Sequence, residues 1–92
     1  MPPITTYNVI TPNDDGKNDL FIIKGIEYYP NSLLYIYNRW GQKVKEFEGY
    51  KNNWPYGGDN DTLSSGVYYY VLLLRDSRAK KNAYKGPLSV IK

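Results

Sequence analysis

Oxygen-bearing side chains crowd one short stretch near the start of the chain, around Gly16. Four of them fall within seven residues: Asn13, Asp15, Asn18 and Asp19. Carboxylate and amide oxygens are the ligands that Ca²⁺ prefers, so this stretch is the first candidate for chemistry. An EF-hand loop that begins at Asn13 does not fit, because Lys17 takes the fifth position and Lys24 the twelfth, where glutamate is required. A looser calcium site stays open as an alternative.

The interpretation that we favour for this stretch is an Asx turn. In such a turn the side chain of Asn13 or Asp15 accepts hydrogen bonds from backbone N–H groups, and Gly16 adopts a positive φ. Asp19 would then cap the loop where the next strand begins. We therefore expect neither a metal nor a cofactor. If a metal does bind, calcium is the candidate.

The composition lacks the residue types that most often carry catalysis. The 92 residues include no cysteine and no histidine, which removes thiolate chemistry, the commonest zinc ligands and the commonest general base. Three carboxylates could still form an acid/base pair: Glu48, Asp59 and Asp61. A glycosidase cleft in so short a chain without histidine would be unusual, so we expect neither an enzyme nor any catalytic residue.

Length and charge restrict the remaining classes. A chain of 92 residues forms one domain, and its net charge of +3 comes from scattered lysines, so a nucleic-acid partner is not expected. No apolar run reaches about 18 residues and no leader peptide is recognisable, so we expect no membrane insertion and no signal peptide. We interpret residues 1–7 as a tag or linker remnant before a module of a longer protein.

Apolar residues recur with a period of two along nearly the whole chain, which is typical of β-strands. The segments that read as strands are 4–10, 20–25, 33–40, 43–47, 66–74 and 84–91. Gly41 and Gln42 predict a tight turn between two of them, and residues 75–82 predict a polar hairpin loop. Six or seven short strands separated by regular turns predict an all-β fold, an immunoglobulin-like Greek-key β-sandwich.

The alternation also assigns side chains to faces of the sheets. In 33–40 one face carries Leu34, Ile36, Asn38 and Trp40, and the other carries Tyr35, Tyr37 and Arg39. Segment 66–74 has apolar residues on both faces, which predicts a central strand covered on both sides. Pro87 predicts an edge position or a bulge in the last strand, because proline cannot donate to a sheet ladder.

The sequence also allows predictions of which aromatic side chains are buried and which are exposed. Trp40 and Trp54 are expected as core or loop anchors, because tryptophan mostly buries its ring. Arg39 has three candidate contacts: an acidic group of a partner, the ring of Tyr37, or the carboxylate of Glu46. The 11 tyrosines cannot all be buried, and we expect four of them to line one face: Tyr35, Tyr37, Tyr68 and Tyr70.

Several motifs together resemble one known family. The order NVITPNDDGKND, an apolar strand, GIEYYPNS and YNRWG resembles the first half of the gliding motility-associated C-terminal domain, the type B sorting domain of the type IX secretion system. YKNNW, SSGVYYYVLLL and YKGPLSVIK are similar to its second half, so the resemblance extends from Asn8 to Lys92. Two positions depart from the pattern: Asp14 stands where the family usually has glycine, and Pro55 follows Trp54 where the family usually has Asp or Asn.

The resemblance implies a role in protein export without catalysis. Such domains form the C-terminus of larger secreted proteins of gliding, Bacteroidetes-type bacteria. Proteins of the type IX secretion machinery recognise them in the periplasm and at the outer membrane, and the folded passenger reaches the cell surface. The motifs imply the following recognition residues: Asn13, Asp15, Gly16, Asn18, Asp19, Asn38, Arg39, Trp40, Gly41, Trp54, Gly66, Tyr68, Tyr70, Lys85 and Gly86. We expect recognition through a sheet face or edge, by strand addition or by an aromatic patch.

Two other classes of binding module remain as alternatives. A carbohydrate-binding β-sandwich would use exposed tyrosines and Asn or Asp side chains to hold sugars. An oligonucleotide-binding barrel would use aromatic residues beside lysines, and the low positive charge argues against it.

Overall fold

The computed structural model describes residues 4–11, 20–55, 63–79 and 81–91. In this part of the chain the strands and the single short helix follow in this order: β1 (Thr5–Thr6), β2 (Val9–Ile10), β3 (Ile23–Lys24), the 3₁₀ helix η1 (Ile26–Tyr28), β4 (Leu33–Tyr37), β5 (Lys43–Glu48), β6 (Gly66–Leu73) and β7 (Ala83–Val90). The all-β class is therefore confirmed, and η1 is one turn within the connection that we expected around Pro30.

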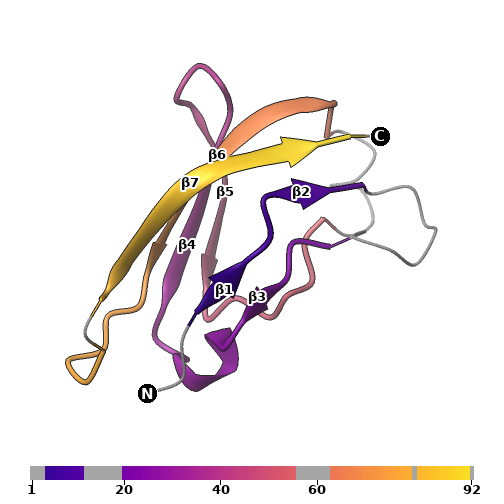
Figure 1. The fold of residues 1–92 in the computed structure, drawn as a ribbon. Coiled ribbons are helices and arrows are strands. Elements are labelled where there is room, and N and C mark those ends of the chain that lie inside the picture. The colour runs from indigo at the N-terminus through magenta and orange to yellow at the C-terminus, as the bar shows by residue number, and fades with distance from the viewer. Residues whose placement is uncertain (1–3, 12–19, 56–62, 80, 92) are drawn as a thin grey trace.

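The strands form two sheets that lie one over the other (Figure 1). The larger sheet has five strands in the order β2-β7-β6-β4-β5, and the smaller one pairs β1 with β3. Neighbouring strands of the larger sheet are antiparallel, except β2 and β7, which run parallel. This arrangement agrees with the predicted β-sandwich, with layers of unequal size.

The core lies against one face of the five-stranded sheet. Its buried side chains come from every second position of the strands: Ile10, Leu34, Ile36, Tyr68, Tyr70, Leu72, Leu88 and Val90. The register explains this set, since Leu34 pairs with Leu72 and Ile36 with Tyr70, which places their side chains on the same face. The period of two that predicts the strands therefore also builds the core.

Short segments rather than long strands make the second layer. Phe21 and Ile23 are fully buried although only Ile23 and Lys24 pair as a strand. The loop after β5 adds Tyr50 and Trp54, which are buried under the larger sheet together with Ile26 of η1. Trp54 is 2% exposed, so its predicted role as a buried anchor of a polar loop is confirmed.

The first predicted strand divides between the two sheets. Thr5 and Thr6 pair with β3 in the smaller sheet, whereas Val9 and Ile10 pair with the end of β7 in the larger sheet. The chain crosses from one layer to the other between β1 and β2, as Figure 1 shows. Thr5 and Thr6 lie in the stretch 1–7 that we interpreted as a tag or linker remnant, and they are part of the fold.

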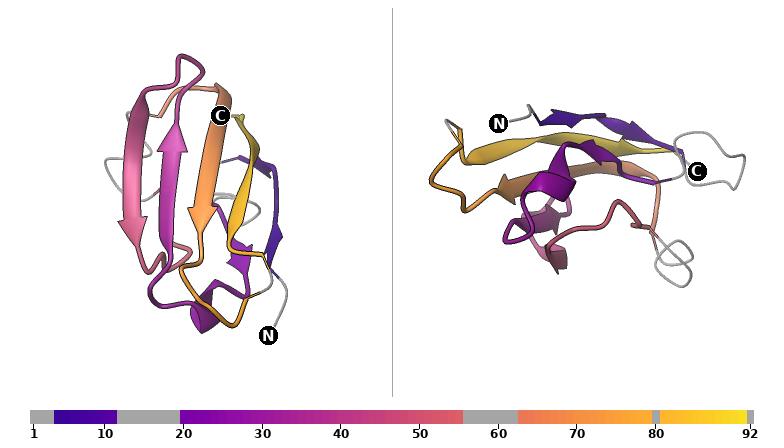
Figure 2. Two further views of the ribbon diagram at one scale, coloured as in Figure 1. Left: turned by 90° about the vertical axis from the view of Figure 1, so that its left-hand side faces the viewer. Right: turned by 90° about the horizontal axis from the view of Figure 1, so that it is seen from below.

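The outer face of the five-stranded sheet is open to solvent (Figure 2, left). The prediction that β6 is covered on both sides is therefore wrong, since Val67 and Tyr69 are exposed while Tyr68 and Tyr70 are buried. The expected face of four tyrosines is wrong for the same reason. Tyr69, paired with Tyr37, takes the place that we expected for Tyr68 and Tyr70.

Pro87 occupies an edge position, as predicted. β7 runs without interruption from Ala83 to Val90, and Pro87 pairs with Tyr69 of β6. The N–H groups of Ser89 and Ile91 donate to the carbonyl groups of Asn8 and Ile10, so the nitrogen of Pro87, two residues before Ser89, points to the same side. β2 pairs only with Ser89 and Val90, so no ladder bond is lost at Pro87.

Gly49 fits tightly beneath the connection from η1 to β4. Its φ is +63°, and a Cβ at this position would lie 2.9 Å from the carbonyl oxygen of Pro30. We predict that Gly49→Ala lowers the free energy of unfolding by about 2 kcal/mol, because the left-handed backbone strain adds to a clash with backbone. Chemical denaturation followed by fluorescence measures this loss.

Gly41→Ala is the matched control for Gly49→Ala. Gly41 has a φ of +81°, and nothing lies within 4 Å of its would-be Cβ. This variant therefore adds backbone strain without a clash, and should lose about 1 kcal/mol. Equal losses in the two variants would show that the contact with Pro30 has no effect.

The loop between β6 and β7 contains a carboxylate held by several donors. Asp76 accepts hydrogen bonds from the backbone N–H and the guanidinium of Arg78, and these contacts lower the pKa of Asp76 to about 2. Because this pKa lies below the value of 3.8 for the free side chain, the contribution to stability is present above about pH 4 and is lost as pH falls toward 2. An NMR titration of the Asp76 carboxyl carbon should show this midpoint, and a midpoint near 3.8 would contradict the contact with Arg78.

Candidate functional site

The turn between β4 and β5 is held rigidly by the side chain of Asn38. Its Oδ1 accepts the backbone N–H groups of Trp40 and Gln42, both at 3.0 Å, and its Nδ2 donates to the Gln42 side chain at 2.9 Å. The backbone closes the turn through Gly41 N–H to the Asn38 carbonyl at 3.0 Å. Gly41 provides the positive φ that the turn requires. The predicted tight hairpin turn is thus confirmed, and its backbone is fixed at both ends.

Trp40 projects from this turn into solvent. Its side chain is 70% exposed, so the prediction that Trp40 is a core or loop anchor is wrong. The reason is that β4 ends at Tyr37, and the alternation that would place Trp40 inside does not continue into the turn. The guanidinium of Arg39 lies over the Trp40 ring, 4.4 Å from its centroid, rather than on Tyr37 or against Glu46.

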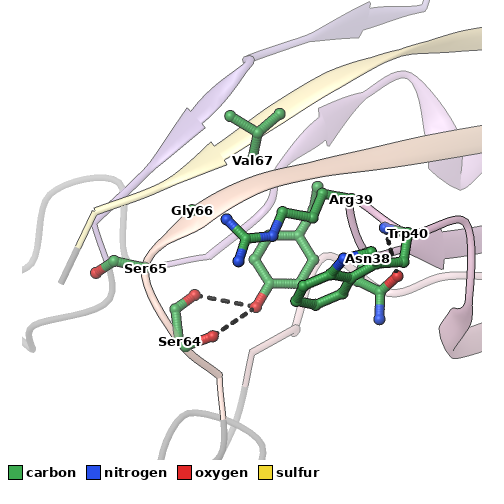
Figure 3. Close-up of a pocket in the computed structure, with 8 residues that line it drawn as sticks. Asn38, Arg39, Trp40, Ser64, Ser65, Gly66 and Val67 are labelled. Carbon is green, nitrogen blue, oxygen red and sulfur yellow. Dashed lines mark hydrogen bonds between the residues drawn. The ribbon is translucent and has the colours of Figure 1, made fainter.

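A small pocket adjoins the turn where β6 begins (Figure 3). Its lining comes from two segments distant in sequence: Asn38, Arg39, Trp40, Ser64, Ser65, Gly66, Val67 and Tyr68. The Tyr68 hydroxyl donates to the Ser64 carbonyl at 3.0 Å and lies 3.3 Å from its side-chain hydroxyl, as the dashed lines in Figure 3 show. The buried side chain of Tyr68 therefore connects the segment before β6 to the larger sheet.

Among the described residues that line this pocket, Arg39 carries the only charge. Lys43, at the beginning of β5, is engaged elsewhere: its ammonium donates to the Glu46 carboxylate and lies 5.4 Å from the centroid of the Tyr35 ring. The hydrogen bond to Glu46 is the main reason why the pKa of Lys43 is raised above its usual value. The described lining therefore carries one positive charge beside an exposed aromatic ring.

The structure brings together five of the residues that we expected to take part in recognition. Asn38, Arg39, Trp40, Gly66 and Tyr68 line the pocket, and Gly41 closes the turn above it. Ser64, Ser65 and Val67 also line it and were not among the candidates. The signal in the sequence for Ser64 and Ser65 was SSG at the start of SSGVYYYVLLL, which we interpreted only as part of a family motif.

The remaining described candidates lie away from this pocket. Trp54 is in the core, and Tyr70 is buried with its hydroxyl 3.0 Å from the Oγ1 of Thr6. Gly86 leaves room for the Tyr70 ring, because a Cβ there would lie 3.3 Å from ring atoms. Lys85 is on the outer face of β7, where it pairs with Val71. These residues shape the fold or another surface.

The proposed calcium residues lie outside the described part of the chain, so the looser calcium site stays a prediction: Asn13, Asp15, Asn18 and Asp19. Gly16 lies in the same undescribed stretch. Among the residues that the structure does describe, no three acidic, histidine or cysteine side chains gather as a metal site would require. Within the same residues, no helix has the length and apolar character needed to cross a membrane.

The pocket lies at the opposite end of the sheet from the beginning of the chain. Gly66, at the pocket, pairs with Val90 near the end of β7, whereas Leu73 pairs with Ala83 at the far end. Figures 1 and 2 show the N-terminal end beside η1 at that far end, and the β4–β5 turn at the other. The turn is therefore well separated from β1.

These features define a small all-β domain with a hydrogen-bonded turn that carries a solvent-exposed tryptophan. A family model, the CHU_C type IX secretion signal domain, matches residues 4–90. The chain belongs to this family, which confirms the resemblance found in the sequence. Comparison with curated proteins and with solved structures gave no significant match.

Proposed function

We propose that this domain is a C-terminal sorting signal that directs a folded passenger across the outer membrane to the cell surface. The observation that carries the proposal is the family match over residues 4–90, nearly the whole chain. Proteins of the type IX secretion machinery in the periplasm and outer membrane would bind the folded domain. The passenger would be joined covalently ahead of β1.

We also propose that the domain acts without catalysis. The composition supports this, since the chain has no histidine and no cysteine. Among the described residues that line the pocket beside Trp40 there is one cation and no carboxylate, so these residues offer no acid/base pair. Its contribution to export would be binding alone.

A reporter fusion tests the sorting function. A folded fluorescent protein is directed to the periplasm of a bacterium that has the type IX apparatus, with or without residues 1–92 at its C-terminus. We expect the fused reporter to become sensitive to protease added outside intact cells, and the reporter without the domain to stay protected. A fused reporter that folds and remains protected would contradict the proposal.

The open sheet face favours carbohydrate binding as a second candidate function. Tyr35 and Tyr37 lie on this face with ring centroids 6.4 Å apart, and Tyr69, 48% exposed, pairs with Tyr37. Adjacent rings on an open sheet face could stack against sugar rings. Binding of soluble polysaccharides that disappears in Tyr37→Ala and Tyr69→Ala would support this function, and no binding at millimolar concentrations would exclude it for the glycans tested.

A further inference from the structure

An exposed tryptophan on a rigid turn needs a physical explanation. Trp40 is 70% exposed while the other tryptophan of the chain is 2% exposed, although burial of a large aromatic side chain is strongly favourable. Trp40 contributes nothing to the described core. Its exposure therefore fits a contact with another molecule better than a role in folding.

The turn is ordered before any partner binds. Three contacts of the Asn38 side chain and the bond from Gly41 N–H fix the backbone on both sides of Trp40. The guanidinium of Arg39 already lies on the ring, so the two side chains form one surface. This surface would therefore lose little conformational entropy when a partner binds, which favours affinity.

The charge at this site indicates the chemistry of the partner. Arg39 is the only charged residue among the described residues that line the pocket, and no ion pair to it is found within that part of the chain. A guanidinium offers a planar pair of donors that matches a carboxylate. Tryptophan and arginine are also the residues most enriched where binding energy concentrates in protein interfaces.

We propose that a protein of the export machinery binds this domain at the Arg39–Trp40 surface, through a loop that offers a carboxylate to Arg39 and an apolar side chain to Trp40. This inference rests on the proposed sorting function and names the surface and the partner chemistry for it. The location supports it, because a passenger joined ahead of β1 lies at the other end of the sheet and leaves the turn accessible.

Export of the reporter fusion by surface variants tests this inference. Trp40→Ala and Arg39→Glu should each reduce the surface-exposed reporter by about tenfold or more, with the reporter accumulating in the periplasm. Arg39→Lys keeps the charge and should export more reporter than Arg39→Glu. Tyr69→Ala is the matched control, because Tyr69 is an exposed aromatic residue on the open sheet face and should leave export unchanged.

The outcomes separate this inference from the function on which it rests. Thermal unfolding of the purified variants should match that of the unsubstituted domain, which shows that lost export is lost recognition. Normal export of Trp40→Ala and Arg39→Glu would overturn the inference and leave the sorting function intact. Lost export of Tyr69→Ala alone would move the recognition surface to the sheet face and overturn it as well. No export of the unsubstituted fusion would remove both proposals.

Discussion

Replacing Trp54 with alanine should lower the free energy of unfolding by about 3 to 5 kcal/mol, the largest loss that we expect from a single substitution. Trp54 is buried, and its ring packs edge-on against Phe47 with centroids 6.5 Å apart. The substitution would leave a cavity under the larger sheet, in a loop that has few other apolar side chains. Urea denaturation followed by far-UV circular dichroism measures the loss.

Trp40→Ala is the natural control for Trp54→Ala, since it removes the same side chain from an exposed position. We expect it to change the free energy of unfolding by less than about 0.5 kcal/mol, as surface substitutions usually do. Comparable losses in the two variants would mean that Trp40 packs against the domain, contrary to its exposure of 70%. The difference between the two variants therefore tests the division of the tryptophans into a structural and an exposed one.

The second large effect is expected from removal of one buried hydroxyl. The Tyr50 hydroxyl donates a hydrogen bond to the Phe21 carbonyl at 2.6 Å and accepts one from the Trp54 backbone N–H at 3.1 Å. It therefore connects the loop that follows β5 to the segment that precedes β3. Burial of this hydroxyl raises the pKa of Tyr50 above its usual value. Tyr50→Phe keeps the ring and leaves two buried backbone groups unpaired, which should cost about 2 to 4 kcal/mol.

Tyr69→Phe provides the comparison for the Tyr50 hydroxyl. Tyr69 is exposed on the outer face, so loss of its hydroxyl should change the free energy of unfolding by less than about 0.5 kcal/mol. Chemical denaturation of the two variants under the same conditions gives both values. A loss below about 1 kcal/mol in Tyr50→Phe would show that water or a rearranged loop replaces the bonds to Phe21 and Trp54.

The period of two in the sequence was sufficient to predict the strands and much of the core. Leu34 and Ile36 are buried because alternate residues of a strand point to one face, and this can be read from the residues of β4 alone. The turn at Gly41 was likewise predictable, since glycine readily adopts the positive φ that it has there. Rules that use only residues close together in the chain therefore predicted these strands and this turn reliably.

Pairing between distant strands could not be predicted in the same way. The alternation of β6 shows that Tyr68 and Tyr70 share a face, but not that this face is the one opposite to Tyr35 and Tyr37. The register decides it, since Tyr37 pairs with Tyr69 and Tyr35 with Val71. A change of one residue in this register would reverse every assignment of faces on β6.

The sequence predicted five of the residues that line the candidate pocket, but not its three-dimensional arrangement. The motif around Arg39 and Trp40 includes the turn that lines the pocket, but the rule that tryptophan is usually buried gave the wrong exposure for Trp40. The pocket depends on the end of β4 meeting the beginning of β6, two segments that lie far apart in the sequence. Only the three-dimensional structure could join Ser64 and Gly66 to this turn.

The most direct measurement compares export of the reporter fused to residues 1–92 in two strains, one with a functional type IX apparatus and one with the apparatus inactivated. If the folded domain is an address that this machinery reads, the reporter should be at the surface of the first strain and in the periplasm of the second. Equal amounts at the surface of both strains would show another export route. A folded fusion confined to the periplasm of both would show that the domain is not a sufficient signal.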